Sequence, residues 1–171
     1  QASTYGVSTM STGDNGDTLA LLNIDLEDAS GDTAITLNLN NKQTTAAGND
    51  MVITEVQAAG VETLTINADA VASTSSAADN IEIATLTATS LTTLNINGDA
   101  DFLYDNAAGL EDGITTINAS GATDVVNLLL SPDSGAVTYT GGSGVDTLNF
   151  GETLTSADSV DGGAGSDTVT A

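Results

Sequence analysis

The stretch Gly-Gly-Ser-Gly-Val-Asp-Thr-Leu-Asn occupies residues 141–149, and Gly-Gly-Ala-Gly-Ser-Asp-Thr-Val-Thr occupies residues 162–170, 21 residues further on. Both follow the pattern Gly-Gly-x-Gly-x-Asp, with an aliphatic residue two positions after the aspartate. The glycines permit positive φ and can turn carbonyl groups inward, and the aliphatic residue can begin a buried strand. We therefore expect each nonapeptide to be a tight turn that leads into a strand of a repeated unit.

Short alternating phrases recur along the rest of the chain, such as Leu-Thr-Ile-Asn at residues 64–67 and Leu-Asn-Ile-Asn at residues 94–97. Aliphatic residues at every second position are typical of a strand with one buried face. Residues that usually line exposed helix faces are nearly missing, because the chain has a single Lys or Arg. The sequence thus predicts an all-β fold.

Two rows of polar residues repeat at intervals of 21–23 residues. They are Asn97, Asn118, Thr140 and Asp161, and, just downstream, Asp101, Asp124, Asp146 and Asp167. Two rows with nearly one period indicate a structural repeat. We predict a parallel β-solenoid with coils of about 21–22 residues, of which roughly seven fit the chain. A β-sandwich is the competing fold, since it also uses many short strands.

We interpret residues 1–171 as a single solenoid module and expect it to be an excerpt of a longer chain. In residues 1–90 the intervals lengthen to 27–30 residues, which predicts irregular coils with loop insertions such as residues 71–78. A short helix over residues 70–78 is the alternative there. Residues 91–171 are expected to form regular coils that end in the two nonapeptides.

The charge is strongly one-sided, with 24 acidic residues against one basic residue and a net charge of −23. A hydrophobic content of 40% can fill a core, although disorder without a ligand stays an alternative for the C-terminal third. One Lys cannot neutralise a phosphate backbone, which excludes nucleic acid as a partner. No apolar run is long enough to span a membrane, and residues 1–4 do not resemble a signal peptide.

The glycine- and aspartate-rich turns predict bound calcium (Ca²⁺). Calcium takes about six to eight oxygen ligands, so one turn cannot complete the shell, whereas a second turn stacked on the first can do so. The predicted metal-site residues are Gly141, Gly142, Gly144, Asp146, Gly162, Gly163, Gly165 and Asp167. The alternative is that these turns are merely tight corners.

Weaker copies of the motif add Asp124, Asp14 and Asp17 as candidate metal ligands, and Asp99 and Asp101 as fainter ones. Each of these could instead be an ordinary turn aspartate that accepts a hydrogen bond from its own backbone.

The two nonapeptides resemble those of the RTX (repeats-in-toxin) family, in which the copies follow each other without gaps. The phrases at residues 61–68, 91–98 and 114–121, followed by sparse nonapeptides, resemble proteobacterial S-layer proteins. This resemblance implies type I secretion, an extracellular location on the bacterial cell surface and calcium-dependent assembly. The implied partners are further copies of the chain, and cell-surface polysaccharide or lipopolysaccharide.

We expect no enzymatic activity, because the chain has no His or Cys, and no cleft or aromatic platform marks the carboxylate pairs Asp99/Asp101 and Glu111/Asp112. The expected function is a structural, self-assembling S-layer module. An RTX-type adhesin is the close alternative. An ice-binding solenoid is another, because Thr recurs at alternate positions; the pairs are Thr63 and Thr65, Thr85 and Thr87, and Thr138 and Thr140. The uneven coils before Asn97 argue against a long flat array.

Overall fold

The computed structural model describes residues 2–10, 18–24, 33–42, 50–70, 80–106, 109–110, 113–130 and 135–171, and within these ranges every regular element is a β-strand. The strands are β1 (Ala2–Met10), β2 (Thr18–Leu19), β3 (Leu22–Asn23), β4 (Ala34–Lys42), β5 (Met51–Ile53), β6 (Val56–Gln57), β7 (Thr63–Ala70), β8 (Asn80–Ile83), β9 (Leu86–Thr87), β10 (Thr93–Gly98), β11 (Asp101–Tyr104), β12 (Thr116–Ala122), β13 (Val126–Leu129), β14 (Thr138–Thr140), β15 (Thr147–Asn149), β16 (Ser159–Asp161) and β17 (Thr168–Thr170).

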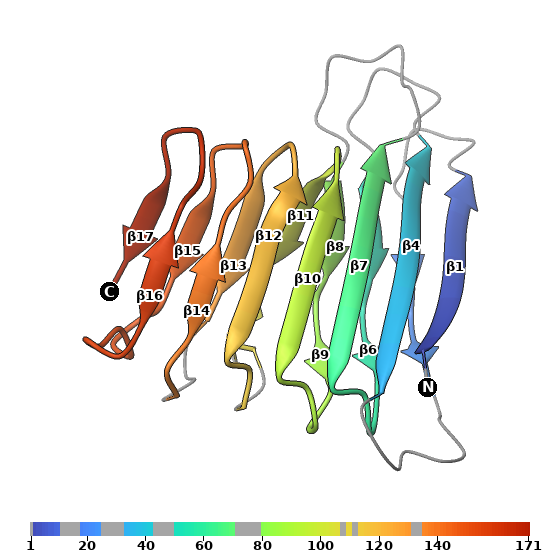
Figure 1. The fold of residues 1–171 in the computed structure, drawn as a ribbon. Coiled ribbons are helices and arrows are strands. Elements are labelled where there is room, and N and C mark those ends of the chain that lie inside the picture. The colour runs from blue at the N-terminus through green and yellow to red at the C-terminus, as the bar shows by residue number, and fades with distance from the viewer. Residues whose placement is uncertain are drawn as a thin grey trace.

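The strands form three parallel sheets. The first sheet has seven strands in the order β1-β4-β7-β10-β12-β14-β16, and the second has seven in the order β17-β15-β13-β11-β8-β5-β2. The third sheet contains β3, β6 and β9. Figure 1 shows the first and second sheets facing each other along the length of the molecule. The chain visits the sheets in turn and then starts a new coil beside the last, so the predicted all-β parallel β-solenoid is confirmed and a β-sandwich of antiparallel strands is excluded.

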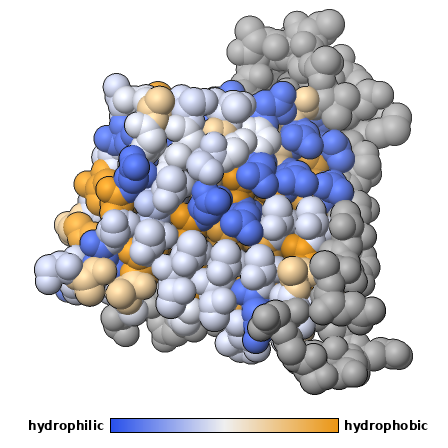
Figure 2. All heavy atoms as spheres, viewed as in Figure 1, coloured by the Kyte–Doolittle hydropathy of each residue, from blue (hydrophilic) through white to orange (hydrophobic). Residues whose placement is uncertain are grey.

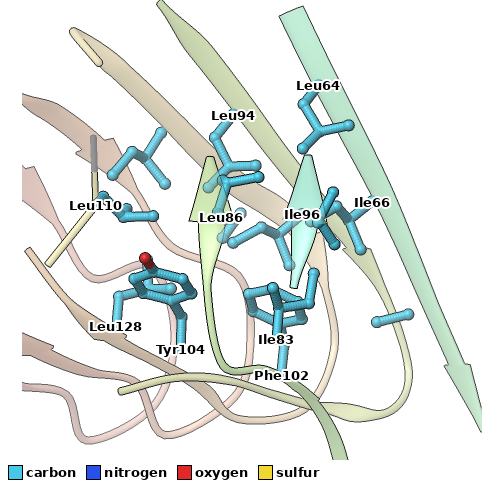
Figure 3. Packing of buried hydrophobic residues seen from close by; sticks show 14 of the residues in the cluster. Leu64, Ile66, Ile83, Leu86, Leu94, Ile96, Phe102, Tyr104, Leu110 and Leu128 are labelled. Atoms are coloured by element: carbon cyan, nitrogen blue, oxygen red, sulfur yellow. The ribbon is translucent and has the colours of Figure 1, made fainter. Parts of the chain in front are cut away.

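The alternating sequence places one side of each strand in the core. In β7, for example, Leu64, Ile66 and Ala68 are buried, while the residues between them are partly exposed. Figure 3 shows side chains from the first and second sheets, among them Ile96 and Phe102, packed between the two sheets. The buried residues form one continuous apolar cluster along the solenoid axis, which is where burial of apolar surface stabilises the fold.

The longer coils of the N-terminal half have a structural cause. Thr93 of β10 pairs with Thr63 on one side and Thr116 on the other, 30 and 23 residues away. The third sheet ends at β9, so the coils up to that strand have three sides in the described residues, and the later coils have two. Part of the extra length therefore builds a third side of the solenoid, and the predicted loop at residues 71–78 lies outside the described residues.

The structure corrects one of the two predicted rows. Asn118 pairs with Asn95, and Asn97 pairs with Gly121, because the register shifts between these two steps. An extra residue on β12 opposite Ile96 makes this β-bulge. Asn97 therefore does not belong to the row with Asn118, and Asn95 takes its place.

No helix in the described ranges is long and apolar enough to cross a membrane.

The substitution Leu94→Ala tests the core. Leu94 is 1% exposed and its backbone lies between those of Leu64 and Ile117, so the truncation leaves a cavity that neighbouring coils cannot close without losing their register. We expect a loss of about 2–5 kcal/mol in the free energy of unfolding, measured by denaturant titration. The adjacent, outward-facing Thr93→Ala should cost less than about 1 kcal/mol; equal effects of the two variants would contradict the assigned strand orientation.

Candidate metal site

The two nonapeptide turns lie side by side at one edge of the solenoid. One joins β14 to β15, and the other joins β16 to β17; both are at the upper edge in Figure 1. The strands before and after the turns pair in register, with Thr140 opposite Asp161 and Thr147 opposite Thr168. The second turn therefore stacks directly on the first, which is the arrangement that a shared ion would need.

The glycines in these turns serve two different physical requirements. Gly163 and Gly165 have φ values of +81° and +132°, which other residues rarely adopt. The other four have no positive φ, contrary to the expectation from the sequence. At Gly142 and Gly144 a Cβ would overlap the carbonyl oxygens of Ala122 and Asp124 in the preceding coil.

Carbonyl oxygens consequently line the interface between the two turns. A Cβ on Gly141 would overlap the Gly162 carbonyl oxygen, one on Gly163 would overlap that of Gly142, and one on Gly165 would overlap that of Gly144. These backbones approach closely only because no side chain separates them. The turns thus place backbone oxygens where a side chain would otherwise lie.

Asp146 points inward and is 1% exposed. Its Oδ1 accepts a hydrogen bond from the Val126 backbone N–H at 3.0 Å, and its Oδ2 accepts one from the Tyr139 hydroxyl at 2.9 Å. Burial, followed by the hydrogen bond to Asp146, raises the pKa of Tyr139 well above its usual value of 10. Tyr139 therefore stays protonated at physiological pH and remains a donor to the carboxylate.

Asp167 occupies the same position in the next coil, and its Oδ1 accepts a hydrogen bond from the Asp146 backbone N–H at 2.9 Å. Its Oδ2 faces Gly162, just as the Oδ2 of Asp146 faces Gly141. Val126, Asp146 and Asp167 thus follow one another along a single inward-facing row. The two carboxylates are stacked as the sequence predicts.

The oxygen donors in the two turns fit a hard cation. Backbone carbonyls of Gly141, Gly142, Gly144 and Gly162 and the carboxylates of Asp146 and Asp167 gather there, with no nitrogen or sulfur side-chain ligand. Calcium prefers such oxygen donors, in larger number than most metals. Within the described residues no three acidic side chains cluster in a way that could hold a metal, so backbone carbonyls would have to supply much of the coordination shell.

The weaker candidates have different positions. Asp124 lies opposite Gly144 rather than Asp146, so the predicted row of Asp124, Asp146 and Asp167 is wrong at its first member. An extra residue in the coil before Asp146 explains the offset. Asp124 presents its carbonyl oxygen to the next turn, while its own carboxylate accepts a hydrogen bond from Val125 N–H at 3.1 Å. Asp14 and Asp17 lie outside the described residues.

Several acidic side chains in turns have a role that the sequence reasoning missed. Asp158 accepts hydrogen bonds from the backbone N–H groups of Val137 at 2.8 Å and Thr155 at 2.7 Å, and these bonds lower its pKa. Asp99 accepts one from the Ala70 N–H at 2.8 Å. In each case a carboxylate of one coil satisfies an N–H group of the coil before it. Acidic residues in turns therefore need no metal to be explained.

Negative charge is crowded elsewhere on the solenoid. Burial and the neighbouring Asp99 raise the pKa of Asp69, and burial with the charges of Asp105 and Asp50 raises the pKa of Glu82. Like charges in adjacent coils disfavour ionisation of each other. The net charge of −23 is thus felt along the length of the molecule.

Compared with known proteins, the chain matches no family model, no curated protein and no solved structure. Its function has to be inferred from its own residues and their geometry. Tyr139 is the functional residue that sequence reasoning missed, because it precedes the nonapeptide and only the pairing of the strands brings its hydroxyl to Asp146.

The substitution Gly144→Ala tests the close approach of the turns. The added methyl group overlaps the Asp124 carbonyl oxygen, so we expect a loss of about 1–3 kcal/mol in the free energy of unfolding in chelator. Ser143→Ala, at the exposed neighbouring position, is the matched control and should change stability by less than about 0.5 kcal/mol. A neutral Gly144→Ala would show that the two backbones are not in contact.

Proposed function

We propose that this chain is a structural module of an extracellular bacterial surface layer, which binds calcium and assembles with further copies of itself. The observation that carries the proposal is the stacking of two glycine-rich turns whose carbonyl oxygens and two carboxylates face the same interface. Such a set of oxygens fits calcium and has no evident use in catalysis. The cell-surface location and type I secretion rest on the resemblance of the nonapeptides and strand phrases.

In this proposal, Asp146 and Asp167 hold the ion together with the carbonyl oxygens of the glycines around them. Bound calcium supplies positive charge at an edge where two carboxylates are stacked. Because the coordinating groups come from two successive coils, binding couples the last coil to the one before it. Ligands that a folded chain brings together and an unfolded chain does not will convert binding free energy into stability.

Self-association follows from the charge of the module. Copies that carry a net charge of −23 repel one another, most strongly at low ionic strength. Divalent cations can reduce this repulsion and bridge acidic surfaces. Partners other than a second copy, such as a cell-surface polysaccharide or lipopolysaccharide, would need the same neutralisation if they were anionic.

A calcium titration followed by circular dichroism and light scattering tests the proposal. We expect β-structure or thermal stability to rise with calcium, and larger particles to form at higher calcium. The double variant Asp146→Asn with Asp167→Asn should lose the response, since it removes both charges from the turns. Asp99→Asn, which removes one charge outside the nonapeptides, is the control and should keep it.

Three outcomes separate the alternatives. A chain that is equally stable and monomeric in chelator and in excess calcium contradicts the proposal. A chain that gains stability with calcium but stays monomeric, and binds cells or glycans, is an RTX-type adhesin. A response that survives in the double variant places the calcium site elsewhere in the chain.

A second candidate function, ice binding, is favoured by the outer face of the first sheet. Thr residues follow one another in register across four coils, ending in a Ser; the row is Thr63, Thr93, Thr116, Thr138 and Ser159. The expectation that uneven coils break this array is wrong, because the extra residues lie outside the first sheet. Figure 2 shows this face drawn mostly in pale and blue shades. Asn67 donates a hydrogen bond to Asn38 at 2.7 Å, and Asn97 donates one to Asn67 at 3.0 Å, which holds the face rigid.

An ice-recrystallisation assay tests this second function. A flat, rigid array of hydroxyl groups should slow the growth of ice grains, and Thr116→Lys should abolish the effect by placing a long charged side chain in the row. Thr87→Lys is the control, since Thr87 is exposed on the third sheet. Ice growth equal to that in buffer alone would rule out ice binding.

A further inference from the structure

The buried carboxylate of Asp146 is satisfied without any ion. One of its oxygens accepts the Val126 backbone N–H and the other accepts the Tyr139 hydroxyl, and both Asp146 and Tyr139 are 1% exposed. A buried carboxylate without partners would strongly oppose folding. Hydrogen bonds from a backbone N–H and a phenol hydroxyl therefore do here, in part, what a cation would do.

The next coil lacks this arrangement. Val160 pairs with Tyr139 in the first sheet, so an aliphatic side chain that cannot donate stands where the hydroxyl stands one coil earlier. Asp167 accepts the Asp146 backbone N–H through its Oδ1, while its Oδ2 faces Gly162. The two nonapeptides are thus alike in their turns and different in the strand residue that meets the aspartate.

We infer that Tyr139 is a positioning residue that takes the place of calcium at Asp146, so that the coil formed by β14 and β15 folds without the ion and calcium dependence falls mainly on the last coil. This inference rests on the proposed calcium site. The hydroxyl holds the Asp146 carboxylate toward the core, and an ion must compete with that hydrogen bond for the same oxygen. Tyr139 accordingly weakens calcium binding at Asp146 while it stabilises the calcium-free chain.

Three variants test the inference through the rise in Tm that calcium chloride produces over chelator. Tyr139→Phe keeps the buried ring and removes the hydroxyl, so Tm in chelator should fall by several degrees and the calcium-induced rise should exceed that of wild type. Val160→Tyr offers a hydroxyl to Asp167, and the rise should shrink. Tyr104→Phe is the control: its hydroxyl donates to the Gly109 carbonyl at 2.8 Å, away from the turns, so Tm should fall equally in both conditions.

Isothermal titration with calcium supplies the second readout, and the dissociation constant of Tyr139→Phe should fall severalfold below that of wild type. A calcium-induced rise in Tyr139→Phe that equals or is smaller than that of wild type overturns the inference and leaves the proposed function standing. A wild-type chain that calcium neither binds nor stabilises overturns both. If Tyr139→Phe does not fold in chelator, an unchanged rise in Val160→Tyr overturns the inference by itself.

Discussion

Parallel pairing of each coil with the next is the constraint on which the rest of this structure depends. In the first sheet β10 contacts β7 and β12, and the same relation recurs from β1 to β16. Strands about 4.8 Å apart leave no room for a side chain between turns, so glycine is required where one turn lies on the next. The same closeness stacks carboxylates, and it brings carbonyl oxygens of one coil against Cα atoms of another. Candidate metal chemistry in this chain is therefore a consequence of how the coils stack.

The stacked acidic residues have two roles that the structure separates. Asp158 and Asp99 accept backbone N–H groups of the preceding coil and lie outside the nonapeptides. Asp146 and Asp167 also accept such groups, but they do so beside turns lined with carbonyl oxygens. An aspartate in a turn is thus weak support for a metal, and the glycines around it decide. Within the nonapeptides, Tyr139 and Val160 make the two otherwise similar sites unequal.

Much of the fold could be predicted from the sequence, because alternation and period report directly on strands and coils. The third sheet could not be, since β3, β6 and β9 have only two residues each and show no alternation of their own. The row through Asn97 failed because a β-bulge on β12 shifts the register by one residue, which no spacing reveals. The turns around Asp146 and Asp167 could be found from their motif. The partner of Asp146 could not, because Tyr139 reaches it only through the fold.

Hydrogen exchange measured by mass spectrometry, with calcium and with chelator, tests the central claim most directly. The account predicts that calcium slows exchange most in residues 161–170, less in residues 140–149, where Tyr139 already satisfies Asp146, and very little in residues 80–104, which lie in coils without a nonapeptide. Exchange that calcium leaves unchanged throughout the chain, or slows only in residues 80–104, would contradict a calcium site between the two stacked turns.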